Sequence, residues 1–177
     1  MTHRPAWLIA APIVFLILWS AGFAVAKIAV THAAPLTVLA LRYSIVVALL
    51  IPVALVMRPA WPSRRGVLDV AVVGFLIQVV YFALCYVAFK SGVSAGAVSI
   101  IVCLQPILVA LIAPRFVGEK VSAKGWAGLI LGLLGAALAI AGRSAIAAEN
   151  AFGIIATFLA LLGITAGTLW EKRFGVS

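Results

Sequence analysis

The sequence has 177 residues, of which 66% are hydrophobic and only 10% are charged. A soluble domain carries about 25% charged residues because its surface needs polar cover, so a soluble globular fold is excluded. In a bilayer the backbone must satisfy its own hydrogen bonds, and apolar runs of about 20 residues suit helices rather than the shorter, alternating strands of a barrel. The predicted fold class is all-α, a polytopic membrane helix bundle.

Six apolar segments follow one another along the chain, and we expect each to form a transmembrane helix. They cover about residues 6–26, 36–56, 67–89, 93–113, 125–141 and 152–170. Pro35 suits the start of the second helix, and Gly142 and Arg143 suit the end of the fifth. Arg4 and Ala24-Val25-Ala26 also fit a secretory signal peptide, but the apolar run between them is longer than a usual signal core.

The cationic residues, which give a net charge of +9, lie mostly between the apolar segments. Nine of them fall on one side of the predicted bundle: Arg4, Arg58, Arg64, Arg65, Arg115, Lys120, Lys124, Lys172 and Arg173. Three fall on the other side: Lys27, Lys90 and Arg143. Because Lys and Arg accumulate in cytoplasmic loops, this bias predicts a multi-pass protein of the cell (inner) membrane with a cytoplasmic amino terminus, and no nucleic-acid partner.

Glycines recur on one face of the fifth segment. Gly125, Gly128, Gly132, Gly135 and Gly142 include pairs exactly seven residues apart, which share a helix face. Small residues on one face let membrane helices approach closely. The pattern predicts a helix-packing seam, and the alternative is that glycine is simply common in membrane helices.

HExxH, CxxC and glycine-rich phosphate-loop motifs are absent from the sequence. The acids all lie at segment ends or in connections: Asp69, Glu119, Glu149 and Glu171. Cys85 and Cys103 fall inside apolar runs, where we expect small apolar packing residues. We therefore expect no catalytic residue, no metal site, no cofactor and no enzyme activity.

Arg42 places a charge inside the second apolar segment, about one third of the way along it. Such a charge costs up to about 2.5–3.5 kcal/mol at the centre of a membrane helix, so it must face water or a partner. Two interpretations stay open: a structural role, with the side chain reaching the headgroups or a backbone carbonyl, and a role in substrate binding or gating. Lys27, at the end of the first segment, is a second candidate for a gating or structural role.

Three further segments place polar or aromatic side chains at similar membrane depth. Trp19 lies just past the middle of the first segment, Gln78 and Tyr81 share a face of the third, and Gln105 lies near the middle of the fourth. Pro106 removes a backbone hydrogen bond, and irregular backbone at this depth is tolerated where it lines a cavity. The set predicts a substrate site at the midplane. Packing or an interhelical hydrogen bond would also explain each residue alone.

The sequence resembles the EamA-type branch of the drug/metabolite transporter superfamily. The resemblance is carried, in order, by Leu18-Trp19-Ser20-Ala21-Gly22-Phe23, Lys27, Pro35, Leu41-Arg42-Tyr43, Ala83-Leu84, Gln105-Pro106-Ile107, Gly118-Glu119-Lys120 and Trp126-Ala127-Gly128. It implies ten helices built as two inverted five-helix repeats. Residues 1–143 would form one repeat, and residues 144–177 would hold a sixth helix that begins an incomplete second repeat. We therefore expect a truncated chain.

The resemblance implies a secondary carrier, an exporter of amino acids or other small metabolites, working by alternating access. Four-helix relatives use a glutamate in their first helix to exchange protons for cationic drugs, and this chain has none there, so a carboxylate-bearing solute fits better. The expected partners are the lipid bilayer, a small-molecule solute, and a second copy or a complementary half-transporter. Without that half, Arg42, Gln78 and Gln105 are expected to lack partners. The alternative is a non-transporting membrane subunit or an inactive remnant.

Overall fold

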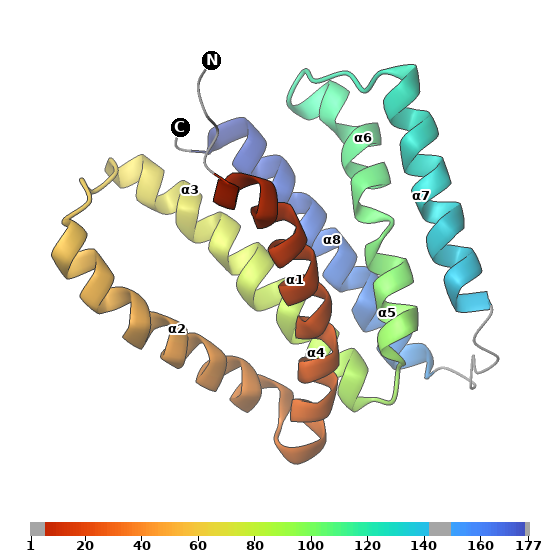
Figure 1. Cartoon of the computed structure of the whole chain (residues 1–177), viewed down its shortest axis with the longest axis horizontal. Coiled ribbons are helices and arrows are strands. Elements are labelled where there is room, and N and C mark those ends of the chain that lie inside the picture. Colours follow the sequence, from red (N-terminus) through yellow and green to blue (C-terminus); the bar gives the residue numbers. More distant parts are fainter. Residues whose placement is uncertain (1–5, 142–149, 176–177) are drawn as a thin grey trace.

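The computed structural model describes residues 6–141 and 150–175, and within them it is built from helices alone (Figure 1). In chain order the elements are α1 (Ala6–His32), α2 (Pro35–Met57), α3 (Arg64–Gly74), the π-helix η1 (Phe75–Tyr81), α4 (Phe82–Lys90), α5 (Ala95–Val102), α6 (Gln105–Phe116), α7 (Ala123–Ala141) and α8 (Ala151–Phe174). The predicted all-α fold class is confirmed.

These elements account for five of the six predicted membrane crossings. Five helical stretches in the described part are long and apolar enough to cross a bilayer: Ala10–His32, Pro35–Met57, Arg64–Lys90, Ala95–Phe116 and Ala151–Phe174. A shorter apolar stretch, Ala123–Gly135, lies within α7. The predicted end of the fifth segment at Gly142 and Arg143 lies outside the described residues.

The third crossing is a helix whose middle turns are π-helical. At the end of η1 the Phe82 N–H bonds to the carbonyl of Val79, where a regular α-helix would use the carbonyl of Gln78. The Gln78 carbonyl instead lies 2.7 Å from the hydroxyl of Tyr43 in α2. A side chain from a neighbouring helix thus contacts the backbone of the π-helical turns, a departure from regular helix that hydropathy does not predict.

The fourth crossing is interrupted where Pro106 predicted irregular backbone. α5 ends at Val102 and α6 begins at Gln105, so Cys103 and Leu104 separate the two helices. Pro106 has no N–H to donate to the carbonyl of Val102, which is its regular partner in an α-helix. The break falls near the middle of the crossing, and the chain continues in the same direction afterwards (Figure 1).

The centre of the bundle is α8, which packs against α3, η1, α4, α5 and α6. One face of α8 consists mainly of small residues that are fully buried, including Gly153, Ala160 and Gly167. Small residues let the backbone of α8 approach the third and fourth crossings closely, which gives van der Waals contact that lipid cannot supply. This last described helix therefore holds the middle of the bundle together.

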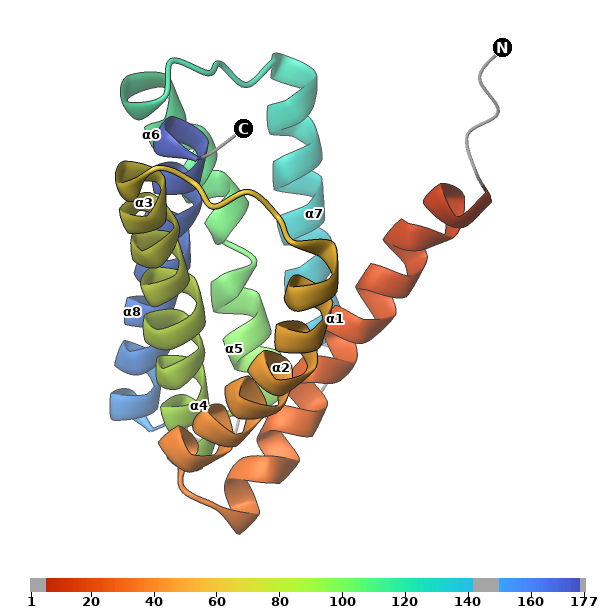
Figure 2. The ribbon, with the colours of Figure 1, turned by 90° about the vertical axis from the view of Figure 1, so that its left-hand side faces the viewer.

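The other helices are peripheral and expose apolar side chains along most of their length. α2 touches only α1 and α4 substantially, and α7 touches α5. Figure 2 shows the amino-terminal half of α1 leaning away from the remaining helices. Its side chains from Ile13 to Leu18 are all exposed, and a bilayer or further protein must cover them.

The connections alternate between two ends of the bundle (Figure 1). One end, called the basic end here, holds the α2–α3 loop, the α6–α7 loop and the carboxyl end of α8. The opposite end, called the turn end, holds the α1–α2 and α4–α5 turns. The arrangement gathers the cation-rich connections at one end, as the alternation of crossings requires. A cytoplasmic location for the basic end stays a prediction.

Candidate solute-binding site

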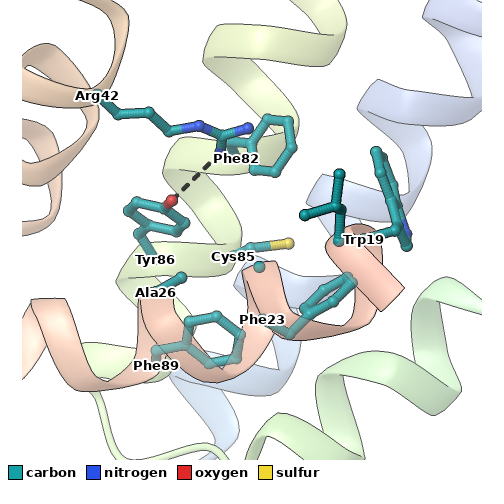
Figure 3. A pocket seen from close by; sticks show the side chains of 10 residues that line it. Trp19, Phe23, Ala26, Arg42, Phe82, Cys85, Tyr86 and Phe89 are labelled. Carbon is teal, nitrogen blue, oxygen red and sulfur yellow. Dashed lines mark hydrogen bonds between the residues drawn. The ribbon is translucent and has the colours of Figure 1, made fainter. Parts of the chain in front are cut away.

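A small pocket lined by aromatic rings lies between α1, α2 and α4 (Figure 3). Its volume is about 80 Å³, enough for a few water molecules or one small functional group. We call it the aromatic pocket, and its lining residues are Leu18, Trp19, Gly22, Phe23, Ala26, Arg42, Phe82, Cys85, Tyr86 and Phe89. Three of the rings come from one face of α4, because residues spaced by three and four lie one above the other on a helix.

Arg42 is the charged group of the aromatic pocket. Its guanidinium carbon lies 4.3 Å from the centre of the Phe82 ring, and its Nη1 donates a hydrogen bond of 3.3 Å to the hydroxyl of Tyr86. The ring face offers an electrostatic partner that does not neutralise the charge. The single ion pair found among the described residues joins other side chains, so Arg42 has no carboxylate partner there. Its remaining N–H donors suit an anionic group.

A larger cavity adjoins this pocket on the other side of α1. It has a volume of about 360 Å³ and lies between α1, α5, α6 and α8. We call it the central cavity, and it is lined by Trp19, Ser20, Phe23, Ser99, Val102, Cys103, Gln105, Pro106 and Ile164. Trp19 and Phe23 line both spaces, so these two rings separate the aromatic pocket from the central cavity. A cavity of this size suits a small metabolite.

Gln105 links the wall of the central cavity to α8. Its Nε2 donates to Thr168 Oγ1 at 3.0 Å, and the Thr168 hydroxyl donates in turn to the Ile164 carbonyl at 2.9 Å. The break between α5 and α6 places Gln105 at the first turn of α6, where it reaches across to α8. A side chain predicted only from its depth therefore acts in an interhelical hydrogen bond beside a cavity.

The structure brings together part of the predicted set and separates the rest. Trp19, Gln105 and Pro106 meet at the central cavity, and Arg42 lies in the adjoining pocket. Gln78 lines neither space.

The remaining predicted side chains lie outside both cavities and pack or bond within the helix bundle. The Tyr43 hydroxyl lies 2.9 Å from Gln78 Oε1, which ties α2 to η1. Tyr81 is completely buried, and its hydroxyl has no hydrogen-bond partner in the described part of the chain. Lys27 Nζ donates to the carbonyl of Val93. The expectation that Arg42, Gln78 and Gln105 lack partners is wrong, because each finds one within this chain.

The glycines of α7 face open space. A Cβ added at Gly128, Gly132 or Gly135 would meet no other atom within 4 Å, whereas at Gly125 it would come within 2.7 Å of Val121 Cγ1. The latter neighbour belongs to the loop before α7, so no helix of the described chain packs on this face. A seam on α7 stays a prediction about a surface that the described residues leave uncovered.

The two cysteines, both expected to be packing residues, have different surroundings. Cys85 is buried beside the aromatic pocket, while Cys103 is exposed and lines the central cavity. Cys103 is therefore not a buried packing residue. The described residues hold no cluster of His, Cys, Asp and Glu able to bind a metal ion.

Sequence reasoning missed the aromatic side chains of α4. Phe82, Tyr86 and Phe89 line the aromatic pocket with Arg42 and Trp19, and their spacing of four and three residues was visible in the sequence. Aromatic residues at helical spacing are common in ordinary cores, so the spacing alone does not distinguish a binding pocket. The position of Arg42 against the rings of Phe82 and Tyr86 is what distinguishes this pocket from an ordinary core.

Comparison with known proteins agrees with this membrane-carrier architecture. The EamA-like transporter family matches residues 6–141, and the chain belongs to this family of the drug/metabolite transporter superfamily. The family points to a membrane transporter rather than an enzyme.

Curated relatives point the same way. The chain is 26% identical over 157 residues to "Uncharacterized inner membrane transporter YedA" of Escherichia coli K12, and equally to the proteins of that name from strains O6:H1 and O157:H7. The match covers 89% of this chain and 50% of each relative, so the chain spans about half the length of the curated relatives it matches. No solved structure matches the chain.

Proposed function

We propose that the chain forms the binding half of a secondary carrier for small carboxylate-bearing solutes, such as amino acids, and that the carrier exports them. The observation that carries the proposal is Arg42 in the aromatic pocket, without a carboxylate partner among the described residues. A solute carboxylate would provide the missing counter-ion. An anion also explains why a cation is kept inside an apolar crossing despite its insertion cost.

The two adjoining spaces suit different parts of one solute. The central cavity, about 360 Å³, has room for the body of a small metabolite, with Gln105 and Ser20 as polar contacts. The aromatic pocket, about 80 Å³, has room for little more than a carboxylate. Movement of Trp19 or Phe23, which separate the spaces, would let the carboxylate reach Arg42.

A complete carrier needs a second wall around this site. The exposed apolar face of α1 and the half-length match to the YedA proteins support a partner half, supplied by further chain, a second copy or a complementary subunit. Alternating access would then arise from rocking of one half against the other around the central cavity.

The test is binding of the proteinogenic amino acids and their amides to the purified protein. The protein should bind acids better than the matching amides. Arg42→Gln should abolish this preference with about a tenfold or greater loss of affinity for the acid, since a charge-assisted hydrogen bond contributes about 1.5–3 kcal/mol.

Two variants control this experiment. Arg42→Lys should restore part of the affinity, because it keeps the charge and loses the planar fork. Arg65→Gln removes a cation at the basic end and should leave binding unchanged. Equal binding of acids and amides by the unaltered protein would reject the carboxylate assignment.

A further inference from the structure

A third cavity opens at the basic end, outside the candidate site. It has a volume of about 450 Å³ and lies between α6, α7 and α8. We call it the vestibule. Its walls include Gln105, Pro106, Thr168, Glu119 and Lys172. Most of its remaining lining is apolar, and the polar groups gather at its two extremities.

The inner extremity of the vestibule adjoins the central cavity. Gln105 and Pro106 line both spaces, so they form the wall between them. The hydrogen bond from Gln105 to Thr168 spans this boundary, because Thr168 lines the vestibule while Ile164, one turn earlier on α8, lines the central cavity. The wall is thin and is held by one interhelical hydrogen bond at the start of α6.

The outer extremity is spanned by an ion pair. Lys172, near the carboxyl end of α8, pairs with Glu119, in the loop between α6 and α7. The two side chains are 38% and 54% exposed, and pairs as exposed as this contribute little to stability. Glu119 follows Gly118, whose positive φ of 82° turns the chain at the end of α6. A weak link on a turning loop can open at small cost.

The turn end is closed by stronger packing. Lys90 Nζ donates to the Val30 carbonyl at 2.9 Å, and Lys27 Nζ donates to the Val93 carbonyl, so two lysines cross between α1 and the α4–α5 region. Val30 and Val93 are themselves at most 1% exposed. Among the described residues, two hydrogen bonds therefore tie the elements of the turn end together, whereas the vestibule opens toward the basic end.

We propose that the vestibule is the access path from the basic end to the central cavity, with the Glu119–Lys172 pair as its outer latch and the Gln105–Thr168 hydrogen bond as its inner barrier. The proposal rests on the proposed function, since it assigns a route to that binding site. It also identifies the described conformation as the one poised to open at the basic end.

Cys103 is a natural reporter for this path, because it lines the central cavity beyond the inner barrier. The protein carrying Cys85→Ala is reconstituted in vesicles, and a membrane-impermeant maleimide is added to each side in turn. Cys103 should be labelled from the side of the basic end. Glu119→Gln and Lys172→Gln should each raise the labelling rate about two- to fivefold, as expected for loss of an exposed pair. Thr168→Val, which removes the acceptor of the inner barrier, should raise it as well.

Two controls separate the latch from general effects of charge. Lys120→Gln removes a cation from the same loop outside the pair and should leave the rate unchanged. The charge-swapped variant Glu119→Lys with Lys172→Glu should return the rate toward that of the Cys85→Ala protein.

Labelling only from the turn end, or equal rates in all variants, would overturn the path. The labelling requires no transport, so its failure is distinguishable from failure of the carrier assignment, which the acid and amide binding experiment tests.

Discussion

α7 and α8 carry the same sequence pattern and meet different surroundings. On α7, Gly125 and Gly132 are seven residues apart, and so are Gly128 and Gly135. On α8, Gly153, Ala160 and Gly167 are spaced by seven, and so are Ala156 and Gly163. The α8 face is buried throughout, whereas Gly128, Gly132 and Gly135 are exposed.

The difference is measurable at each glycine. A Cβ added at Gly163 would lie 2.9 Å from Val80 Cγ1, and one at Gly167 would lie 2.6 Å from Ile77 Cγ1. Branched side chains of η1 therefore fill the space that the glycines leave. Heptad spacing of small residues therefore marks a smooth helix face, and the opposing surface decides whether this face becomes a contact.

The largest expected effect comes from filling both faces with leucine. Gly163→Leu should destabilise the protein by about 1–3 kcal/mol or more, because it forces extra atoms against Val80 and the backbone of Leu76. Gly132→Leu should change stability by less than about 0.5 kcal/mol, as expected at an open surface. Thermal unfolding in detergent measures both. An equal loss in Gly132→Leu would show that a partner covers α7.

Alanine substitutions on the two helices should change the stability by less than the leucine substitutions, and in opposite directions. Gly153→Ala should destabilise by about 1 kcal/mol, because the new Cβ would lie 2.3 Å from both Ser91 Oγ and Val93 Cγ2. Gly128→Ala should stabilise by up to about 1 kcal/mol, since alanine is the better helix former and meets nothing there. Chemical unfolding of the two variants decides the signs. Stabilisation by Gly153→Ala would contradict close packing of α8.

The smallest effect is expected at the buried hydroxyls of α8. Thr165 Oγ1 donates to the carbonyl of Leu161, four residues earlier in the same helix, at 2.7 Å. Thr165→Val keeps the shape and leaves that carbonyl its place in the helix, so the loss should stay below about 1 kcal/mol. A loss as large as that of Gly163→Leu would mean that polar bonds, rather than fit, hold α8 in the bundle.

Among the residues predicted for the candidate site, those that conflict with their surroundings line the described cavities. Arg42 is a charge in an apolar crossing and Pro106 interrupts a helix, and each lines one of the described cavities. Gln78 fits the same argument by depth, yet it bonds to Tyr43 on another side of the third crossing. Depth along a helix is readable from the sequence, but the direction of a side chain depends on helix rotation, and the π-helical turns change that rotation locally.

Composition and hydropathy by themselves determined the membrane environment and the helical class, because in lipid a helix is the simplest element that satisfies its own backbone. Successive crossings must place their connections at alternate ends, and the cation counts then distinguished a basic end from the other. Tertiary structure alone decided that α8 occupies the centre, that Lys172 meets Glu119, and that no described residue packs against Gly128, Gly132 or Gly135 of α7. Each of these depends on which faces of distant segments meet, and in an apolar chain nearly every face is hydrophobic enough to serve, so shape complementarity makes the choice.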